Sequence, residues 1–285
     1  MSSTLLNQLK LKMPEFTAAQ RKVADYVIKH PAEVAFLTTE QLAALTQVSV
    51  ASIMRLAYSM GYTGYAQLQK DLQDVLKDQV APSARFDKNT SSLEKHSILE
   101  ACVTTQIENI NKTAAFLSSS NIKNSFSLIN KAKKIYIVGV RTSHATAYYL
   151  YEGLNRIGLN CELLIPDTSR TQSVLAHMSA ENLLIAISLP RYAKRTIEIA
   201  NVARKKGAKI IAITDAYSSP LAIIADEFLL CTHESVSFHN SGIGSLFLAD
   251  FLISGMASAN PKKAKASLEN IENIVKEFDA NAFKS

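Results

Sequence analysis

Four short apolar runs in the second half of the chain limit its fold more than any other feature. The runs are Ile135–Val138, Leu183–Ile187, Ile210–Ile213 and Phe228–Cys231, and a weaker one lies at Cys161–Ile165. None of them alternates apolar with polar residues, which is typical of strands buried on both faces. Helix-like stretches separate the runs, so we predict an α/β domain with a parallel five-stranded sheet flanked by helices.

The first 77 residues have helical patterning instead, which predicts an all-α domain ahead of the α/β domain. Between Thr17 and Lys29, apolar residues recur at helical spacing. Thr17 has the features of an N-cap, and Gln20 is placed to complete a capping box. Pro31 is expected to end this helix.

The polar stretch 78–97 contains Pro82, several serines and Asn89, which is typical of a linker. We therefore predict a helical domain at residues 1–77, a linker at 78–97 and a sheet domain at 98–285, with helices near 98–117 and 122–132. Two domains fit a length of 285 residues. A last helix over about 262–278 is expected to pack its apolar face either on the sheet domain or on a second copy of the chain. That face comprises Leu268, Ile271, Ile274, Val275 and Phe278.

Composition is that of an ordinary globular protein, with 47% hydrophobic and 20% charged residues. No apolar run has the length of a membrane span, and the first residues lack the pattern of a signal peptide, so we expect a cytoplasmic protein with no membrane contact. Three widely spaced cysteines, Cys102, Cys161 and Cys231, are expected to be reduced thiols, and no metal site or cofactor is expected.

The net charge of +6 permits nucleic-acid binding but does not by itself argue for it. Residues 1–90 carry ten Lys or Arg and eight Asp or Glu, and the rest of the chain carries 21 and 17. Neither part is a basic arm, so evidence for DNA binding has to come from motifs.

The segment Thr39–Leu56 has the pattern of a helix-turn-helix. A short helix is expected near residues 40–45, followed by a turn at 46–48 and a second helix that begins after Ser49. Val48 is expected to fill the angle between the two helices. The N-terminal turns of the second helix would enter the major groove of double-stranded DNA. Four side chains are predicted to point outward there: Ser49, Ala51, Ser52 and Arg55.

The loop after the second helix offers further groups for DNA phosphates. Gly61 is expected to end the helix with a left-handed backbone conformation. Backbone N–H groups, hydroxyls and aromatic rings follow, and we predict phosphate contacts from Tyr62, Thr63 and Tyr65. Trihelical units of this kind also occur as packing modules without DNA, so this alternative stays open from the pattern alone.

Residues Phe16–Leu72 resemble the N-terminal domain of the RpiR family of bacterial transcription regulators. The strings that carry the resemblance are AAQRKVADYVIKHPAEVAFLTTEQLA and VSVASIMRLAYSMGYTGYAQLQ. Gln47 stands where the family usually has glycine, at a position that needs an uncommon backbone angle. The recognition helix reads Ala51-Ser52-Ile53, where the family usually has Ala-Thr-Val. The resemblance implies DNA binding and leaves the operator sequence open.

Two loops of the α/β domain have the features of an anion site. The string IYIVGVRTSHATAYYLYEGL predicts a strand, a loop and a helix, so that Arg141, Thr142 and Ser143 lie at a helix N-terminus. The alternative is that Ser143 only caps its own helix. In the second loop, AISLPRYAKRTIEIA, we expect contacts from Ser188, Arg191 and Tyr192.

The remaining charged residues near these loops are given other roles. Lys194 is expected to be a solvated helix charge. Asp215, after the fourth strand, is expected to cap or turn the chain. Glu234 and Ser237 follow the fifth strand and are predicted to reach the same pocket as the two loops.

From Leu128 to about Ala259 the chain resembles the SIS (sugar isomerase) domain, which is the effector-sensing half of RpiR regulators. The strings ITDAYSSPLAIIADEFLLC and ESVSF also fit that domain. The resemblance implies a phosphosugar at the two loops. Many SIS domains have a Ser-x-Ser-Gly-x-Thr loop after the third strand, and here only the first serine, Ser188, remains. The expected effector is therefore an anionic metabolite such as a phosphosugar, with a carboxylate or another phosphate ester as alternatives.

The residues and the resemblances together predict a transcription regulator and not an enzyme. Its SIS domain would sense an anionic metabolite, a homodimer or tetramer would present two recognition helices, and the regulated genes would serve sugar metabolism. One alternative is a phosphosugar isomerase, for which Glu152, Glu234 and His239 are the candidate acid–base residues. A second alternative is a carbohydrate-binding protein without a role on DNA.

Overall fold

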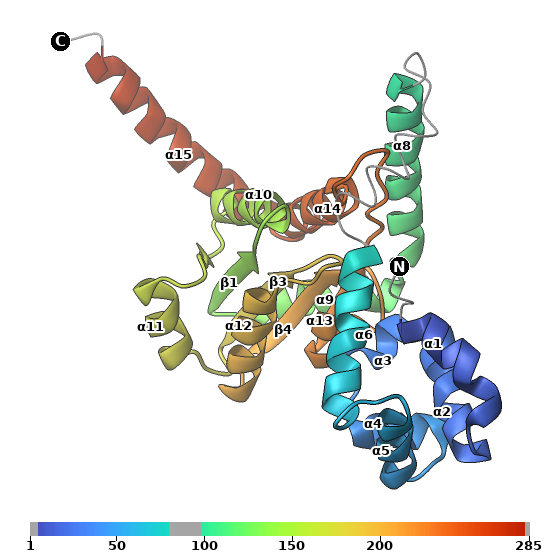
Figure 1. Ribbon diagram of the computed structural model, residues 1–285. Coiled ribbons are helices and arrows are strands. Elements are labelled where there is room, and N and C mark those ends of the chain that lie inside the picture. The colour runs from blue at the N-terminus through green and yellow to red at the C-terminus, as the bar shows by residue number, and fades with distance from the viewer. Residues whose placement is uncertain (1–4, 80–97, 283–285) are drawn as a thin grey trace. The chain divides into compact units, whose positions relative to one another are not determined.

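The structure is a computed structural model that describes residues 5–79 and 98–282 (Figure 1). It divides into two units, Met1–Ser92 and Leu93–Ser285. The dividing point falls inside the predicted linker 78–97, of which residues 80–97 lie outside the described residues. The last helix of the first unit reaches Gln79, so it continues slightly beyond the predicted start of the linker.

The described part of the first unit is helical, as predicted, and its helices enclose a core of their own. Leu9, Leu42, Ile53, Leu56 and Leu72 are among the side chains buried there. The elements are α1 (Leu5–Lys12), the 3-10 helix η1 (Met13–Glu15), α2 (Ala18–Lys29), α3 (Pro31–Val34), α4 (Thr39–Thr46), α5 (Val50–Ser59) and α6 (Tyr65–Gln79).

Side-chain caps fix the starts of two helices in this unit. Thr17 accepts from the Gln20 backbone N–H, and the Gln20 side chain accepts from the Thr17 N–H, so the predicted capping box is confirmed. Thr38 and Gln41 make the same arrangement at α4, which the sequence analysis did not predict. Each box satisfies backbone donors that a helix N-terminus otherwise leaves open.

The second unit contains a parallel five-stranded sheet in the order β2-β1-β3-β4-β5, which confirms the predicted architecture. The strands are β1 (Lys134–Gly139), β2 (Cys161–Leu163), β3 (Asn182–Ile187), β4 (Lys209–Thr214) and β5 (Glu227–Leu230). The weak apolar run became β2, a short half-buried strand at one edge. The order reverses between β1 and β3, which makes that point the topological switch of the sheet.

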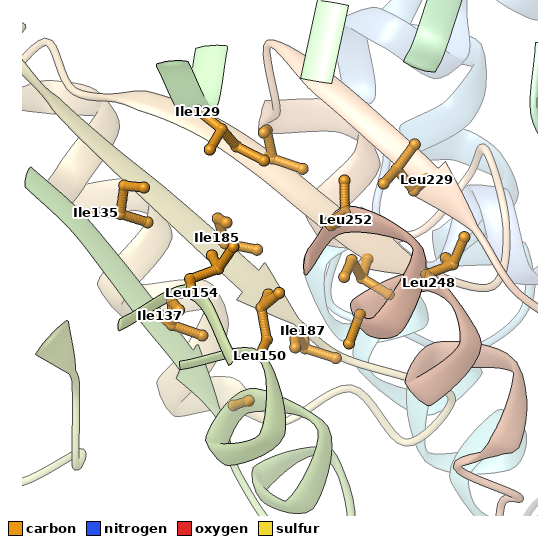
Figure 2. Packing of buried hydrophobic residues seen from close by; sticks show 14 of the residues in the cluster. Ile129, Ile135, Ile137, Leu150, Leu154, Ile185, Ile187, Leu229, Leu248 and Leu252 are labelled. Carbon is orange, nitrogen blue, oxygen red and sulfur yellow. The ribbon is translucent and has the colours of Figure 1, made fainter. Parts of the chain in front are cut away.

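Helices cover both faces of the sheet. They are α8 (Ile98–Phe116), α9 (Ser119–Lys131), α10 (Ser143–Arg156), α11 (Ser169–His177), α12 (Lys194–Lys205), α13 (Pro220–Ile224), α14 (Ile243–Ala259) and α15 (Pro261–Ala282). On one face, α10 and α14 bring Leu150, Leu154, Leu248 and Leu252 onto the sheet (Figure 2). On the other face lie α11, α12 and α13. The sequence analysis did not predict α11 and α13, which are short.

Neighbouring residues along each strand point to opposite faces of the sheet. In β1, Ile137 belongs to the core under α10 and α14, while Val138 belongs to the core under α12. Both side chains are fully buried. This two-sided burial is the reason why the strands lack polar alternation in the sequence.

The described residues contain no single helix with both the length and the apolar composition to cross a membrane. Helices α14 and α15 meet those criteria only as a pair, and they bend by 106° where they join.

Candidate functional site

A left-handed residue sets the turn between α4 and α5. Gln47 has φ 53° and ψ 44°, and the Val48 N–H donates to the Ala43 carbonyl oxygen at 3.1 Å. The predicted uncommon backbone angle at Gln47 is therefore confirmed. A residue with a side chain adopts this conformation at a cost of about 1–2 kcal/mol relative to the right-handed region. Val48 packs at the edge of the core in the angle between the helices, as predicted.

Helix α5 has one buried face and one exposed face. Ser49 begins it as an N-cap by accepting from the Ser52 backbone N–H at 3.3 Å. Ile53 and Leu56 are buried in the core. The exposed face contains five side chains: Val50, Ala51, Arg55, Tyr58 and Ser59.

The prediction that Ser52 points outward is wrong. Its exposed fraction is 5%, because it lies in the first turn on the side that faces α4 and the core. Its hydroxyl lies 3.0 Å from the Ser49 hydroxyl and accepts from the Arg55 guanidinium at 3.0 Å. Ser52 therefore holds Arg55 in place and does not face a ligand itself.

Tyr58 is an exposed residue that the sequence analysis missed. It is 54% exposed and lies three residues after Arg55 on the same face of α5. The spacing Ala51, Arg55, Tyr58 repeats at helical intervals, and that pattern was the available signal.

The loop after α5 exposes fewer side chains that could bond to DNA phosphates than the sequence analysis predicted. Gly61 has φ +87°, which confirms its left-handed conformation at the end of the helix. The Tyr65 prediction is wrong, because its ring is buried and its hydroxyl donates to the carbonyl oxygens of Val34 and Leu37. Tyr62 is half-buried and donates to the Asp71 carboxylate, so its hydroxyl is not available to a phosphate in this structure.

Thr63 is the exposed member of the three loop residues. Its N–H and its hydroxyl both donate to the Gln67 side-chain oxygen, at 2.7 and 2.8 Å. The structure therefore leaves Ser49, Ala51, Arg55 and Thr63 at the surface from the predicted DNA-contact set, and adds Tyr58.

In the second unit, the predicted effector loops lie beside each other at the switch point. Gly139, the last residue of β1, pairs in register with Ile187, the last residue of β3. Neighbouring strands are about 4.8 Å apart, so both loops begin at the same level of the sheet edge. From there α10 goes to one face and α12 to the other. Ligands of open α/β sheets bind at such a switch point.

Each loop contains an arginine in a left-handed backbone conformation. Arg141 has φ 56° and Arg191 has φ 72°. Both side chains are exposed, and neither takes part in an ion pair with another described residue. Strained backbone of this kind is concentrated at functional sites, where the surrounding structure maintains it.

The start of α10 is open to an anion. A Cβ on Gly139 would lie 2.5 Å from the Ser143 carbonyl oxygen, so only glycine lets the helix begin this close to the strand. The N-cap is Thr142, whose side chain makes no capping hydrogen bond. The alternative reading of Ser143 as the cap of its own helix is wrong, since Ser143 is the first helical residue and is buried.

Side-chain hydrogen bonds from Ser188 and Tyr192 fix the conformation of the loop after β3. Ser188 is 2% exposed, and its hydroxyl accepts from the Ala193 N–H at 3.2 Å. Tyr192 donates its hydroxyl to the Asp215 carboxylate at 3.3 Å. Ser188 therefore shapes the loop from inside, whereas the expectation was a direct contact with the effector.

Asp215 accepts hydrogen bonds at the carboxyl edge of the sheet, a role that the sequence analysis did not predict. Its carboxylate accepts from Tyr192 and from the Thr214 hydroxyl, and Thr214 in turn donates to the Ser188 carbonyl oxygen. Burial raises the pKa of Asp215, against a lowering by nearby His233 and by these hydrogen bonds. Burial and the Asp215 carboxylate raise the pKa of Tyr192. Asp215 thus connects the ends of β3 and β4.

The other cations of the second loop have partners. Arg195 pairs with Asp167 at 2.9 Å and with Glu198 at 2.8 Å, and Lys194 lies 3.5 Å from Glu198. The Lys194 side chain is 88% exposed, which confirms that it is a solvated helix charge. Arg191 is the cation that remains for a ligand among these three.

The loop after β5 lies next to the loop after β3. The Asn240 side chain donates to the Pro190 carbonyl oxygen at 3.0 Å. Buried Asn109 on α8 holds the Glu234 backbone by two hydrogen bonds, of 2.8 and 3.1 Å. Glu234 is exposed and Ser237 is half-buried, and the Asn240 hydrogen bond brings their loop to this edge of the sheet.

Two family models match the chain. The "Helix-turn-helix domain, rpiR family" matches residues 3–79, and the "SIS domain" matches residues 128–254. No cluster of His, Cys, Asp or Glu in the described part of the chain has the arrangement of a metal site.

The chain is similar to named regulators and to solved structures. It is 25% identical over 260 residues to the uncharacterized HTH-type transcriptional regulator YbbH of Bacillus subtilis, with 89% of each chain covered. The Vibrio vulnificus NanR protein, solved in complex with ManNAc-6P, is 25% identical with a TM-score of 0.69, over 96% of this chain and 99% of NanR.

A third similarity is to the sugar isomerase domain of an RpiR transcription factor from Sphaerobacter thermophilus. It is 28% identical with a TM-score of 0.61, over 62% of this chain and 99% of that domain. The two family models match the chain in the order of its two units, and the five-stranded sheet has the fold of the similar SIS-domain structures. The chain belongs to the RpiR family of helix-turn-helix transcriptional regulators with a SIS domain.

Proposed function

We propose that this regulator binds a phosphosugar at the switch point between β1 and β3, and that the bound phosphosugar changes its affinity for DNA. The observation that carries the proposal is the pair Arg141 and Arg191, both left-handed, exposed and without an ion pair among the described residues. An arginine fork binds a phosphate with two parallel hydrogen bonds. The open N-terminus of α10 adds backbone N–H donors and a favourable dipole.

The NanR complex supports a sugar phosphate as the effector class. That related regulator was solved with ManNAc-6P. In our chain, Thr142 and Tyr192 border the two arginines, while Glu234 and Ser237 approach on the loop after β5 and offer acceptors and donors for sugar hydroxyls. Ser188 and Ser143 stay buried and hold the loops.

On the DNA side, we propose that the exposed face of α5 enters the major groove. Arg55 reaches a guanine edge or a phosphate, and Ala51 contacts a thymine methyl group. Ser49, Tyr58 and Thr63 contact the phosphate backbone. Residues 1–77 form the DNA-binding part, 78–97 the linker, and 98–285 the effector and oligomerisation part of a homodimer that binds two half-sites.

The two sites communicate only if the phosphosugar prefers one arrangement of the DNA-binding parts. A ligand that binds both arrangements equally shifts nothing. We expect the controlled genes to serve sugar metabolism, because a metabolite of the pathway is the simplest signal for its own enzymes.

The effector site is tested by thermal shift with ManNAc-6P, glucose 6-phosphate and the unphosphorylated sugars. A ligand specific to the folded chain raises the melting temperature. Arg191→Ala should weaken phosphosugar binding by roughly 10- to 100-fold, because it removes a charge-assisted contact. Lys194→Ala is the matched control and should leave binding unchanged. Equal binding by both variants contradicts the site, and turnover of either sugar phosphate would favour the isomerase alternative.

The DNA face is tested with duplexes selected from a random library by the full chain. Arg55→Ala should reduce affinity by about 1–3 kcal/mol while phosphosugar binding persists. Lys29→Ala is the control, because Lys29 is an exposed cation of the same unit that pairs with Asp25. Retained affinity in Arg55→Ala would remove α5 from the interface. Affinity should also fall steeply as salt rises.

A further inference from the structure

Helix α8 holds the loop after β5 with two buried polar side chains. Its buried residues are Asn109 and Thr113. The Asn109 side chain donates to the Glu234 carbonyl oxygen at 2.8 Å and accepts from the Glu234 N–H at 3.1 Å. Thr113 accepts from the Thr232 N–H at 3.1 Å. Buried groups that lose such partners carry the full cost of desolvation, so these bonds fix the loop to the helix.

The far end of the same loop contacts both α8 and the proposed effector site. The Ser241 hydroxyl donates to the Gln106 side-chain oxygen of α8 at 2.5 Å. One residue earlier, the Asn240 side chain donates to the Pro190 carbonyl oxygen at 3.0 Å. Pro190 directly precedes Arg191, one of the two arginines assigned to the effector. Hydrogen bonds therefore connect the loop of Arg191 to α8 by way of the loop after β5.

The start of α14 confines the loop against α8. A Cβ on Gly244 would lie 2.8 Å from the Thr113 hydroxyl oxygen and would also collide with the Thr232 carbonyl oxygen, so only glycine lets α14 approach this closely. The Ser241 N–H donates to the His233 carbonyl oxygen at 2.9 Å, which joins the two ends of the loop. The loop therefore has little room to move without moving α8 as well.

The N-terminal half of α8 has no buried residue. Residues 98–108 of the helix are all half-buried or exposed, so within one chain the polar contacts at Asn109 and Thr113 have a large share in fixing its direction. Helix α8 is also the first described element after the predicted linker 78–97. A rise of 1.5 Å per residue places Ile98 about 16 Å from Asn109, so a small tilt at the loop is a larger displacement where the chain arrives from the helical unit.

We propose that α8 carries the effector signal toward the helical unit, with Asn109 and Thr113 as the positioning residues that join it to the loop after β5. The inference rests on the proposed function, because it concerns the regulation of the proposed effector site. A phosphosugar bound by Arg191 shifts the neighbouring Pro190 carbonyl group, and Asn240 passes the shift to the loop and to α8. The two sites are coupled because both bias one element, the tilt of α8.

The first test uses the full chain without ligand and follows backbone hydrogen exchange residue by residue. In Thr113→Val the Thr232 N–H loses its acceptor and should exchange roughly ten-fold faster, whereas Thr113→Ser keeps the hydroxyl and should match the unchanged chain. Asn240→Ala changes no residue of α8, and it should nevertheless speed exchange at the Glu234 N–H, because the loop moves as a unit. It also serves if Thr113→Val does not fold. Unchanged exchange at Glu234 in Asn240→Ala overturns the proposal.

The second test measures the coupling on a duplex selected by the full chain. The measured quantity is the ratio of the DNA dissociation constants with and without ManNAc-6P or glucose 6-phosphate, whichever raises the melting temperature more. Allosteric ratios are commonly about 5- to 150-fold, and the ratio should fall toward one in Thr113→Val and in Asn109→Ala, while DNA affinity without the sugar stays unchanged. Asn111→Ala, on the exposed side of α8, is the matched control and should keep the full ratio, as should Thr113→Ser.

Failure of this inference and failure of the sensing function give different results. If neither phosphosugar raises the melting temperature of the unchanged chain, the phosphosugar proposal fails, and the exchange test still decides whether the loop and α8 move together. If the sugar changes DNA affinity equally in the unchanged chain and in Thr113→Val, the sensing function stands and the role of α8 is overturned.

Discussion

The Arg55 guanidinium donates a hydrogen bond to the Ser52 hydroxyl at 3.0 Å, one turn earlier in α5. Ser52 is buried, whereas Arg55 is exposed on the face that we assign to DNA. The bond restricts a long side chain that otherwise has considerable rotamer freedom, and an oriented fork is what recognition of a guanine or phosphate needs.

We expect Ser52→Ala to lower DNA affinity by about 0.5–1.5 kcal/mol, because Arg55 loses this partner. Stability should change little, since alanine fits the same space. Ser59→Ala, which removes a hydroxyl at the other end of α5, is the control. Fluorescence anisotropy on a selected duplex measures the effect. Equal affinities of Ser52→Ala and the unchanged chain would contradict the positioning role.

Tyr58→Ala is expected to weaken DNA binding by about 1 kcal/mol, roughly five-fold, through loss of one contact to the duplex. Its exposure of 54% means that truncation removes little packing. Tyr217→Ala removes a tyrosine of the second unit that is 72% exposed, and it should have no effect. If the two variants bind DNA alike, Tyr58 lies outside the interface.

Gln47→Gly should stabilise the chain by about 1 kcal/mol, because glycine adopts φ 53° without the steric cost that a side chain carries. The control is Ala44→Gly within α4, which should destabilise by roughly 0.5–1 kcal/mol. Urea unfolding compares the two. A loss of stability in Gln47→Gly would mean that the glutamine side chain contributes more than its backbone angle costs.

Gly139→Ala should destabilise the chain by roughly 1–3 kcal/mol and abolish the thermal shift with phosphosugars. The added Cβ would lie 2.5 Å from the Ser143 carbonyl oxygen, so the start of α10 has to move. At Gly242 the nearest atom to an added Cβ is Leu246 Cδ1 at 4.0 Å, so Gly242→Ala is the matched control. A wild-type response in Gly139→Ala would place the ligand away from this helix start.

Asp215→Asn tests the pH dependence of the sheet edge. Burial raises the pKa of Asp215 in the folded chain. The stability that such a carboxyl contributes is present below its unfolded pKa of about 3.9 and is lost as pH rises through the folded pKa. The amide removes this dependence and still accepts from Tyr192.

The melting temperature of Asp215→Asn should therefore exceed that of the unchanged chain by a margin that grows from about pH 4 to pH 7. Asp25→Asn, at an exposed carboxyl, should show no such trend. A margin that stays constant or shrinks with rising pH would mean that His233 and the hydrogen bonds outweigh burial at Asp215.

The sequence by itself determined the elements whose signal is local. Apolar runs without alternation predicted four strands and the weak edge strand, because a strand buried on both faces cannot carry polar residues. The Thr17 capping box and the left-handed Gln47 followed from neighbours in the chain. Helix α11 was missed because it is short and mostly polar, and only Thr171 and Val174 are buried in it.

Only the tertiary structure decided which side of each element faces the core, a partner or a ligand. Ser52 and Tyr65 are buried because other helices cover them, and the neighbouring residues in the sequence do not predict which helices pack there. The register of β1 and β3 brought the loops of Arg141 and Arg191 to the same edge of the sheet from positions 50 residues apart in the chain. In the same way, the apolar face of α15 read as a packing surface in the sequence, and the fold left it exposed, because which surfaces meet depends on contacts between distant segments.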